Sequence, residues 1–196
     1  MEPFTRVTGV LAPLDRTNVD TDQIIPKQFL KRIERSGYGP FLFYDWRRNA
    51  DFVLDQPAYR GAAVLVTGAN FGCGSSREHA AWSLLDAGFR AVIAPSFGDI
   101  FKSNSFRCGL LPIELPEAQV AELIRLATEE PGMEVTVDLA ARRIGAGGFE
   151  TSFAIDPFYR ECLLNGWDEI ALTQRQEAAI ARYEAARPAW LPAATP

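Results

Sequence analysis

The sequence predicts an α/β protein, in which a mixed sheet has parallel core strands flanked by helices. In the middle of the chain, apolar runs at 62–67 and 90–95 alternate with segments of helical periodicity. Strands that alternate with helices indicate a sheet with helices on its faces, and two or three of these strands should be parallel. The apolar runs after residue 132 are short, which favours an added antiparallel portion.

The N-terminal part, residues 1–60, is predicted to be rich in loops. A short strand is expected near residues 4–11, and the segment 14–26 opens with Asp, Asn and Thr residues that form turns. A short helix is expected over 27–34. The aromatic segment 41–46, FLFYDW, is interpreted as core packing, with a lid or a partner contact as the alternative.

The core, residues 61–166, and the C-terminal part, residues 167–196, continue the alternation. In chain order we first expect the strand 62–67, a helix that starts at Ser75 or Ser76, and the strand 90–95. A helix with its N-cap near Ser96 and Asp99 should follow and end near Gly109, and an edge strand at 110–115 should contain Pro112. We then expect a helix at 116–130, strands at 133–139, 142–144 and 149–155, a helix at 157–164 capped by Gly166, and a long helix at 168–187. No repeat or linker divides the chain, so residues 1–196 are expected to form a single domain.

The composition argues against several classes of function. Apolar residues make up 47% of the 196, which is ordinary for a globular protein, and the net charge of −5 without a basic run argues against a nucleic-acid surface. No apolar stretch reaches the roughly 18 residues of a membrane span, and the N-terminus lacks the layout of a signal peptide. We therefore expect a cytoplasmic protein that binds neither nucleic acid nor a membrane.

The cysteine and histidine content argues against a metal site in this chain. The three cysteines, Cys73, Cys108 and Cys162, are odd in number and far apart, and His79 is the only histidine. Such spacing predicts neither a disulfide framework nor a Cys/His metal site. Cys73 is interpreted as a small filler rather than a reactive thiolate.

The stretch 68–81, GANFGCGSSREHAA, is the best candidate for a functional site. It follows a predicted buried strand and leads into a predicted helix. Glycines at 68, 72 and 74 let the backbone take positive φ and let another group approach closely.

The expected start of the helix after these glycines is suited to an anion. Ser75 and Glu78 have the spacing of a capping box, and the N–H groups and dipole of a helix N-terminus attract negative charge. Arg77 adds a planar cation that matches a carboxylate or a phosphate. The alternative is an ordinary capped helix after a glycine loop.

Common catalytic and nucleotide-binding motifs do not fit this stretch. The dinucleotide fingerprint GxGxxG fails because Arg77 stands where the third glycine belongs, and the P-loop fails because the loop has no lysine. A Ser-His-Asp hydrolase is disfavoured because His79 lies too close to the serines on the expected helix, and no GxSxG elbow is present. A non-catalytic anion-binding module stays open as an alternative of another class.

The segment 72–80, GCGSSREHA, resembles the motif of the aconitase swivel domain. The segment 18–26, NVDTDQIIP, is similar to the N-terminal signature of the stand-alone form of that domain, and 104–106 with 109–112 also match. With YGPFLFYDWR at 38–47 included, the chain resembles the small subunits of bacterial 3-isopropylmalate dehydratases over nearly its full length.

This resemblance implies a swivelling β/β/α domain that works in a heterodimer. The partner would be the large subunit of 3-isopropylmalate dehydratase, which carries a 4Fe-4S cluster, and this chain would bind no cofactor of its own. The pair would interconvert 2-isopropylmalate and 3-isopropylmalate, by dehydration and rehydration, in leucine biosynthesis.

Carried over to this sequence, the resemblance assigns roles to single residues. It makes Ser75 the catalytic base that takes a carbon-bound proton, while Arg77 and Ser76 bind a substrate carboxylate. The remaining residues of the two motifs would support the loop; they are Gly72, Cys73, Gly74, Glu78, His79 and Asp22.

The resemblance also implies where substrate choice is made. In this family the residues just after the Ile-Ile-Pro segment help to decide which side group is accepted, and here Lys31 and Arg32 are the candidates for substrate contact, with solvated side chains as the alternative. An isopropyl group would need an apolar wall, for which Leu30 or the aromatic stretch near Phe41 is available. A third carboxylate would need Arg32, so homoaconitase, or a related 2-hydroxy diacid hydro-lyase, is the nearest alternative.

Overall fold

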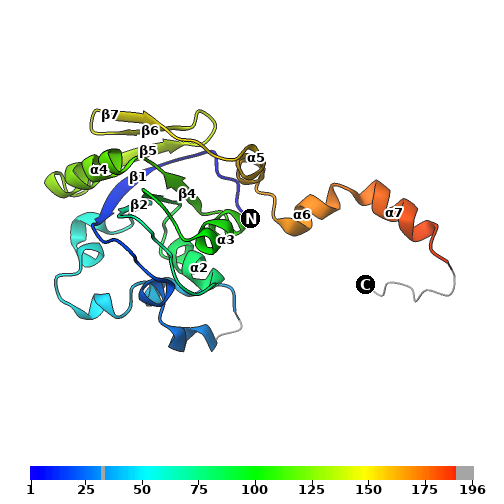
Figure 1. Cartoon of the computed structure of the whole chain (residues 1–196), viewed down its shortest axis with the longest axis horizontal. Coiled ribbons are helices and arrows are strands. Elements are labelled where there is room, and N and C mark those ends of the chain that lie inside the picture. The colour runs from blue at the N-terminus through cyan, green and yellow to red at the C-terminus, as the bar shows by residue number, and fades with distance from the viewer. Residues whose placement is uncertain (32–33, 189–196) are drawn as a thin grey trace.

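Figure 1 shows the computed structural model, which describes residues 1–31 and 34–188. Within these residues, seven strands form one sheet in the order β4-β3-β2-β1-β5-β6-β7. Their bounds are β1 Arg6–Leu14, β2 Val64–Thr67, β3 Ala91–Ala94, β4 Leu111–Glu114, β5 Glu134–Asp138, β6 Arg143–Ala146 and β7 Phe149–Ser152. Strands β1 to β4 pair in parallel, while β5, β6 and β7 are added by antiparallel pairing. The predicted mixed sheet with parallel core strands is confirmed, and β4, which contains Pro112, lies at its edge as expected.

Strand β1 joins the two halves of the sheet. Its first half, Arg6 to Val10, pairs with β5 in antiparallel orientation, and its second half, Leu11 to Leu14, pairs with β2 in parallel orientation. Strand β1 is therefore longer than the short strand that the sequence predicted, because its two halves pair with different neighbouring strands.

The described part of the chain contains seven α-helices. Their bounds are α1 Thr21–Ile24, α2 Glu78–Asp86, α3 Asp99–Cys108, α4 Glu117–Glu129, α5 Pro157–Asn165, α6 Glu169–Gln174 and α7 Glu177–Ala185. Short 3-10 helices fill the N-terminal part at η1 Lys27–Lys31, η2 Gly39–Phe41, η3 Trp46–Arg48, η4 Val53–Asp55 and η5 Pro57–Tyr59.

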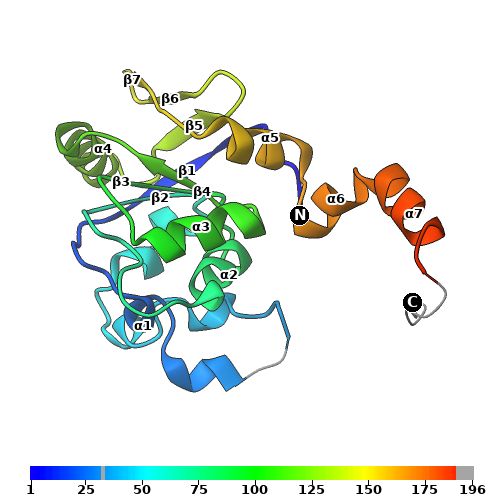
Figure 2. The same ribbon diagram turned by 45° about the vertical axis from the view of Figure 1, so that its right-hand side comes forward.

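The parallel strands are buried on both faces, so the protein has two hydrophobic cores. Successive side chains of a strand point to opposite faces. Leu65 of β2 packs in the core that contains Leu84 of α2, while its neighbours Val64 and Val66 pack in the core that contains Leu123 of α4. Accordingly, α4 lies on one side of the parallel strands and α2 on the other (Figure 2).

The aromatic segment 41–46 packs mainly into the first of these cores. Leu42 and Phe43 are completely buried, and the Phe43 ring stacks on Trp46 with centroids 5.3 Å apart. Tyr44 is the one large apolar side chain of this segment that is counted as exposed, at 37%. This arrangement favours the core-packing interpretation of the segment.

Three local expectations differ from the structure. The helix expected over 168–187 is instead the pair α6 and α7, which extend away from the sheet and have no buried residue (Figure 1). Without a buried face, packing does not hold them in one continuous helix. The break occurs at Arg175, whose guanidinium lies 3.8 Å from the ring centroid of Trp167.

The other two differences concern helix starts and helix type. The N-cap of α3 is Gly98, and the Ser96 hydroxyl, two positions earlier, accepts a hydrogen bond from the Asn70 N–H at 2.9 Å instead of capping the helix. The helix expected over 27–34 is the 3-10 helix η1, and residues 32–33 lie outside the described part.

Candidate active site

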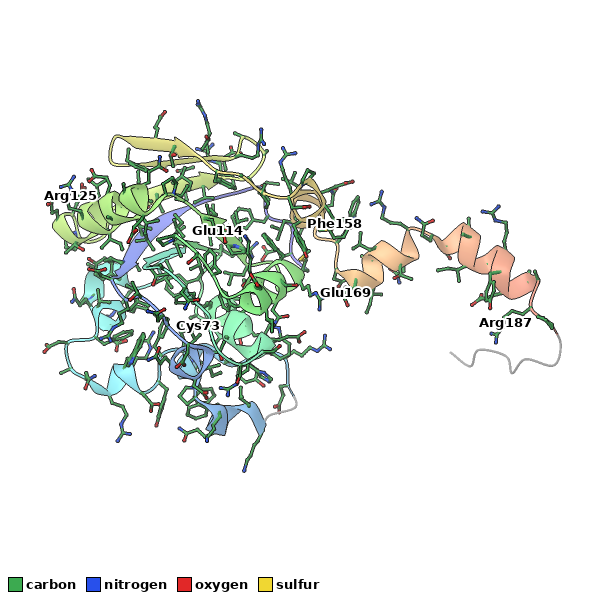
Figure 3. All side chains as sticks on the ribbon, viewed as in Figure 1. Cys73, Glu114, Arg125, Phe158, Glu169 and Arg187 are labelled. Carbon is green, nitrogen blue, oxygen red and sulfur yellow. The ribbon has the colours of Figure 1, made fainter. Side chains whose placement is uncertain are left out.

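The glycine loop between β2 and α2 is hydrogen-bonded to the segment that leads into α1. The Val19 carbonyl accepts hydrogen bonds from the N–H groups of Gly72, at 2.7 Å, and Cys73, at 3.3 Å. The Thr21 N–H donates to the Cys73 carbonyl at 3.0 Å, and Asp20 and Cys73 form a parallel β-bridge. The two sequence motifs, far apart along the chain, therefore build one surface, on which Figure 3 labels Cys73 beside α1.

Close packing explains one glycine of the loop, Gly72, and one glycine that lies against it, Gly98. Gly72 has φ of +73°, and a Cβ atom there would lie 2.2 Å from Cγ of Phe101, a buried residue of α3. A Cβ atom on Gly98 would lie 2.5 Å from the Gly72 carbonyl oxygen. Phe71 lies edge-on to the Phe101 ring, with centroids 5.3 Å apart, so the loop rests on an aromatic base.

Ser75 and Ser76 are exposed on an irregular segment before α2. The predicted capping box of Ser75 with Glu78 is wrong, because the N-cap of α2 is Arg77, whose backbone is extended and whose side chain makes no capping hydrogen bond. The Ser75 carbonyl accepts a hydrogen bond from the Thr21 hydroxyl at 3.0 Å. This contact with α1 ties the serine segment to a neighbouring element, so the helix begins at Glu78 instead of Ser75 or Ser76.

The Arg77 side chain forms a two-point ion pair with Asp22 in the first turn of α1. Nη1 of Arg77 bonds Oδ1 of Asp22, and Nη2 bonds Oδ2 at 3.0 Å. Only 14% of the Arg77 side chain is exposed, against 51% of the Asp22 side chain. The hydrogen bond from Arg77 is the largest cause that holds the pKa of Asp22 below its ordinary value, and it outweighs the opposing effect of burial.

Cys73 and His79 flank this pair and are both kept in their neutral forms. Burial, aided by the charge of Asp20, raises the pKa of the Cys73 thiol, which favours the interpretation of this cysteine as a filler. Burial also lowers the pKa of His79, whose ring lies against Tyr38 and Trp82 with centroids 5.2 and 4.8 Å away. His79 is therefore largely uncharged at neutral pH and packs against the rings of Tyr38 and Trp82, and its role as a support of the loop stays a prediction.

The structure brings only part of the predicted substrate-contact set together. Ser75, Arg77 and Asp22 belong to one cluster, with Ser76 exposed beside them. Lys31 is exposed in the last turn of η1. Arg32 lies outside the described residues. Substrate contact by Lys31 or Arg32 stays a prediction.

The sequence did not single out Thr21, which is 2% exposed and holds Ser75 through its hydroxyl. Neither periodicity nor composition marks a threonine for such a contact, because its partner lies 54 positions later in the chain. The only signal was its place inside the segment NVDTDQIIP.

The described part of the chain contains neither a metal-binding group of side chains nor a helix that could span a membrane. Across residues 1–31 and 34–188, no three His, Cys, Asp or Glu side chains gather as a metal-binding group. An iron–sulfur cluster is held by several cysteine thiolates, and the three cysteines sit separately in the glycine loop, α3 and α5, so these residues do not fit such a cluster. Within the same ranges, every helix is too short or too polar to cross a bilayer.

Comparisons with known proteins agree with this architecture. The model of the aconitase C-terminal domain matches residues 1–118, and the LeuD_N model matches residues 121–157. A solved structure of 3-isopropylmalate dehydratase from Methanocaldococcus jannaschii is 26% identical and superposes with a TM-score of 0.69, covering 91% of this chain and 99% of that one.

Relatives of higher identity carry one name. The small subunit of 3-isopropylmalate dehydratase from Brevibacillus brevis is 56% identical, with 95% of this chain and 100% of the relative covered. The small subunit from Rubrobacter xylanophilus is 53% identical, with 98% of both chains covered. A fold, a serine–arginine loop and two sequence motifs thus agree with full-length similarity, and the chain belongs to the family of 3-isopropylmalate dehydratase small subunits, within the aconitase superfamily.

Proposed function

We propose that this chain acts with a large subunit to interconvert 2-isopropylmalate and 3-isopropylmalate, a step of leucine biosynthesis in the cytoplasm. The observation that carries the proposal is the placing of two exposed serines next to an arginine whose guanidinium is already fixed. The family membership supports the reaction and the need for a partner, because its relatives are named as small subunits.

In this proposal Ser75 is the base of the dehydration. Its alkoxide takes the proton from the carbon next to a substrate carboxylate. The hydroxyl group on the neighbouring carbon takes a second proton from an acid of the large subunit and leaves as water, and a carbon–carbon double bond forms. Water then adds back with the opposite regiochemistry, and Ser75 returns the proton. A serine hydroxyl is a weak acid, so the alkoxide needs nearby positive charge, which Arg77 supplies two positions away.

The open surface at Ser75 explains why a partner is needed. Both serines are exposed in this chain, and water screens the charge of Arg77 at such a surface. A docked large subunit would exclude this water and so strengthen the electrostatic stabilisation of the alkoxide. We place the iron–sulfur cluster on that subunit, where it would supply a Lewis acid for the leaving hydroxyl.

For the substrate carboxylate, we assign Arg77 and Ser76 as the binding groups. A guanidinium binds a carboxylate through two parallel N–H donors, which fixes its orientation as well as its charge. For the isopropyl group, the apolar wall is proposed near Phe29 of η1 and Phe41 of η2, whose rings stack with centroids 4.2 Å apart.

Reconstitution tests this proposal. The chain alone should be inactive, and 3-isopropylmalate should be consumed once the cluster-bearing large subunit is added. Ser75→Ala should lower kcat by roughly 10²–10⁴-fold, the usual contribution of a positioned acid–base group, while the two subunits still co-elute. Ser152→Ala, a change at an exposed serine of β7, should leave kcat unchanged. Normal turnover by Ser75→Ala, or turnover by the isolated chain, would contradict the proposal.

A further inference from the structure

We infer that Asp22 is a positioning residue, which acts through Arg77 and holds its guanidinium ready for the substrate carboxylate. The inference rests on the proposed function, in which Arg77 binds that carboxylate, and it assigns a role to a side chain that does not itself touch substrate. Its starting point is the two-point contact between Asp22 and Arg77.

The geometry leaves Arg77 able to bind a second carboxylate. A guanidinium has five N–H donors in a rigid plane. Asp22 bonds the two terminal nitrogens, Nη1 and Nη2, and so occupies one edge of the plane. The adjacent edge, which carries Nε and the second N–H of Nη2, points in a different direction in the same plane. A substrate carboxylate can therefore bind along the second edge while Asp22 keeps the first.

The helical turn that carries Asp22, α1, is held in place at both ends. Asp20 and Gln23 form a reciprocal capping box at the start of α1, with hydrogen bonds of 2.8 and 2.9 Å. Ile24, at the other end of this helix, is completely buried, and its carbonyl accepts a hydrogen bond from the Phe43 N–H at 2.8 Å. One turn of helix thus presents Asp22 at a fixed place.

The same turn holds both proposed reacting residues. Thr21 bonds the Ser75 carbonyl, and the adjacent Asp22 bonds the Arg77 side chain. The distance between the serine and the guanidinium is therefore set from outside the glycine loop. This is the arrangement expected of a positioning element, because a long arginine side chain otherwise loses much rotational freedom when it binds a ligand.

Burial distinguishes positioning from simple charge compensation. The Arg77 side chain is 14% exposed, while the Asp22 side chain is 51% exposed. Water therefore screens the charge of Asp22 more than that of Arg77, so Asp22 can orient the guanidinium without cancelling its attraction for another anion.

Kinetics of the reconstituted pair test the inference. Asp22→Ala should raise KM for 3-isopropylmalate roughly tenfold, since Arg77 must then be ordered by the substrate itself. The effect on kcat should be smaller, because the carboxylate contact is present in both ground state and transition state. Asp22→Glu, which keeps the charge, should recover a large part of the loss.

The double mutant shows whether Asp22 acts through Arg77. In the Arg77→Lys background a two-point contact is not available, so adding Asp22→Ala should change KM by less than about threefold. Glu122→Gln is the matched control, because Glu122 forms a two-point pair with Arg125 on α4, across the sheet from α2; Arg125 is labelled in Figure 3. This control should leave KM unchanged.

Two results would overturn the inference. A lower KM in Asp22→Ala would mean that Asp22 competes with substrate, and an equal effect of Asp22→Ala with and without Arg77→Lys would mean that it acts elsewhere. An activity-independent measurement separates this inference from the proposed function. In the isolated, ¹⁵N-arginine-labelled chain, the Arg77 guanidinium resonances should be resolved in the unmodified protein and averaged in Asp22→Ala. If the Arg77 resonances were averaged in the unmodified protein, the inference would be contradicted. If they were resolved but the reconstituted pair were inactive, only the proposed function would be contradicted.

Discussion

The packing under the glycine loop predicts that Gly72→Ala is strongly destabilising. Gly72 has φ of +73°, a conformation that costs an L-residue roughly 1–2 kcal/mol. The added Cβ would also lie 2.2 Å from Cγ and 2.6 Å from Cβ of Phe101, which is only 2% exposed. Overpacking of a buried ring costs about 1–3 kcal/mol. Together these effects should lower the free energy of unfolding by about 2–5 kcal/mol and Tm by on the order of 10 °C.

Two other glycines separate these contributions. Gly61 has φ of +71° with no atom near its missing Cβ, so Gly61→Ala measures the conformational cost alone. Gly98 has an ordinary φ of −63°, but its Cβ would lie 2.5 Å from the Gly72 carbonyl oxygen, so Gly98→Ala measures the steric cost alone. Urea denaturation followed by circular dichroism, with the three variants compared at one temperature, gives all three costs.

The expected order of destabilisation is Gly72→Ala greater than Gly61→Ala, with Gly98→Ala also clearly destabilised. Because the loop carries Ser75, the Gly72 variant should in addition lower the activity of the reconstituted pair even where it stays folded. Equal losses for the variants of Gly72 and Gly61 would refute the reasoning, since the contact with Phe101 would then contribute nothing.

Two further predictions concern ionisation. Burial raises the pKa values of Cys73 and Cys162 and brings that of Cys108 to about 11. Iodoacetamide should therefore alkylate the native chain slowly at pH 7 and faster as the pH rises. Rapid labelling of Cys73 at pH 7, seen by peptide mass spectrometry, would contradict this prediction. The pKa of Asp22 is lowered from 3.8, so the stability contributed by its pair with Arg77 should be fully present above that pH and lost as the pH falls through the lower, folded value. Urea midpoints of the unmodified chain and of Asp22→Asn should therefore differ at pH 6 and converge in strong acid, and a constant difference down to pH 2 would show that the charge is not responsible.

Much of the fold followed from local patterns in the sequence. The apolar runs at 62–67 and 90–95 became β2 and β3, and Gly109 and Gly166 end their helices with positive φ as expected. The order of the strands did not follow, because no local pattern shows that β1 pairs with β5, which lies more than a hundred positions later. Pairing of that kind is decided by the packing of the whole sheet.

The site shows the same division between local and distant information. Residue types and spacing were enough to select Ser75 and Arg77, but the predicted capping box was wrong. A capping box depends only on residues within one turn, whereas the backbone at Ser75 is held by Thr21 of a separate element. The partners of Arg77 and Ser75 both lie in α1, so their roles became visible only once the two motifs were placed side by side.

The central position of β1 also bears on how the chain folds as the ribosome makes it. The first strand to emerge has both of its neighbours far downstream, since β2 begins at Val64 and β5 at Glu134. Its two edges stay open until those segments have been synthesised, and open strand edges promote aggregation. Chaperones act on chains whose strands can pair only with segments that are synthesised much later. This small subunit should therefore depend on chaperones, or on early binding to its partner, more than its length alone suggests.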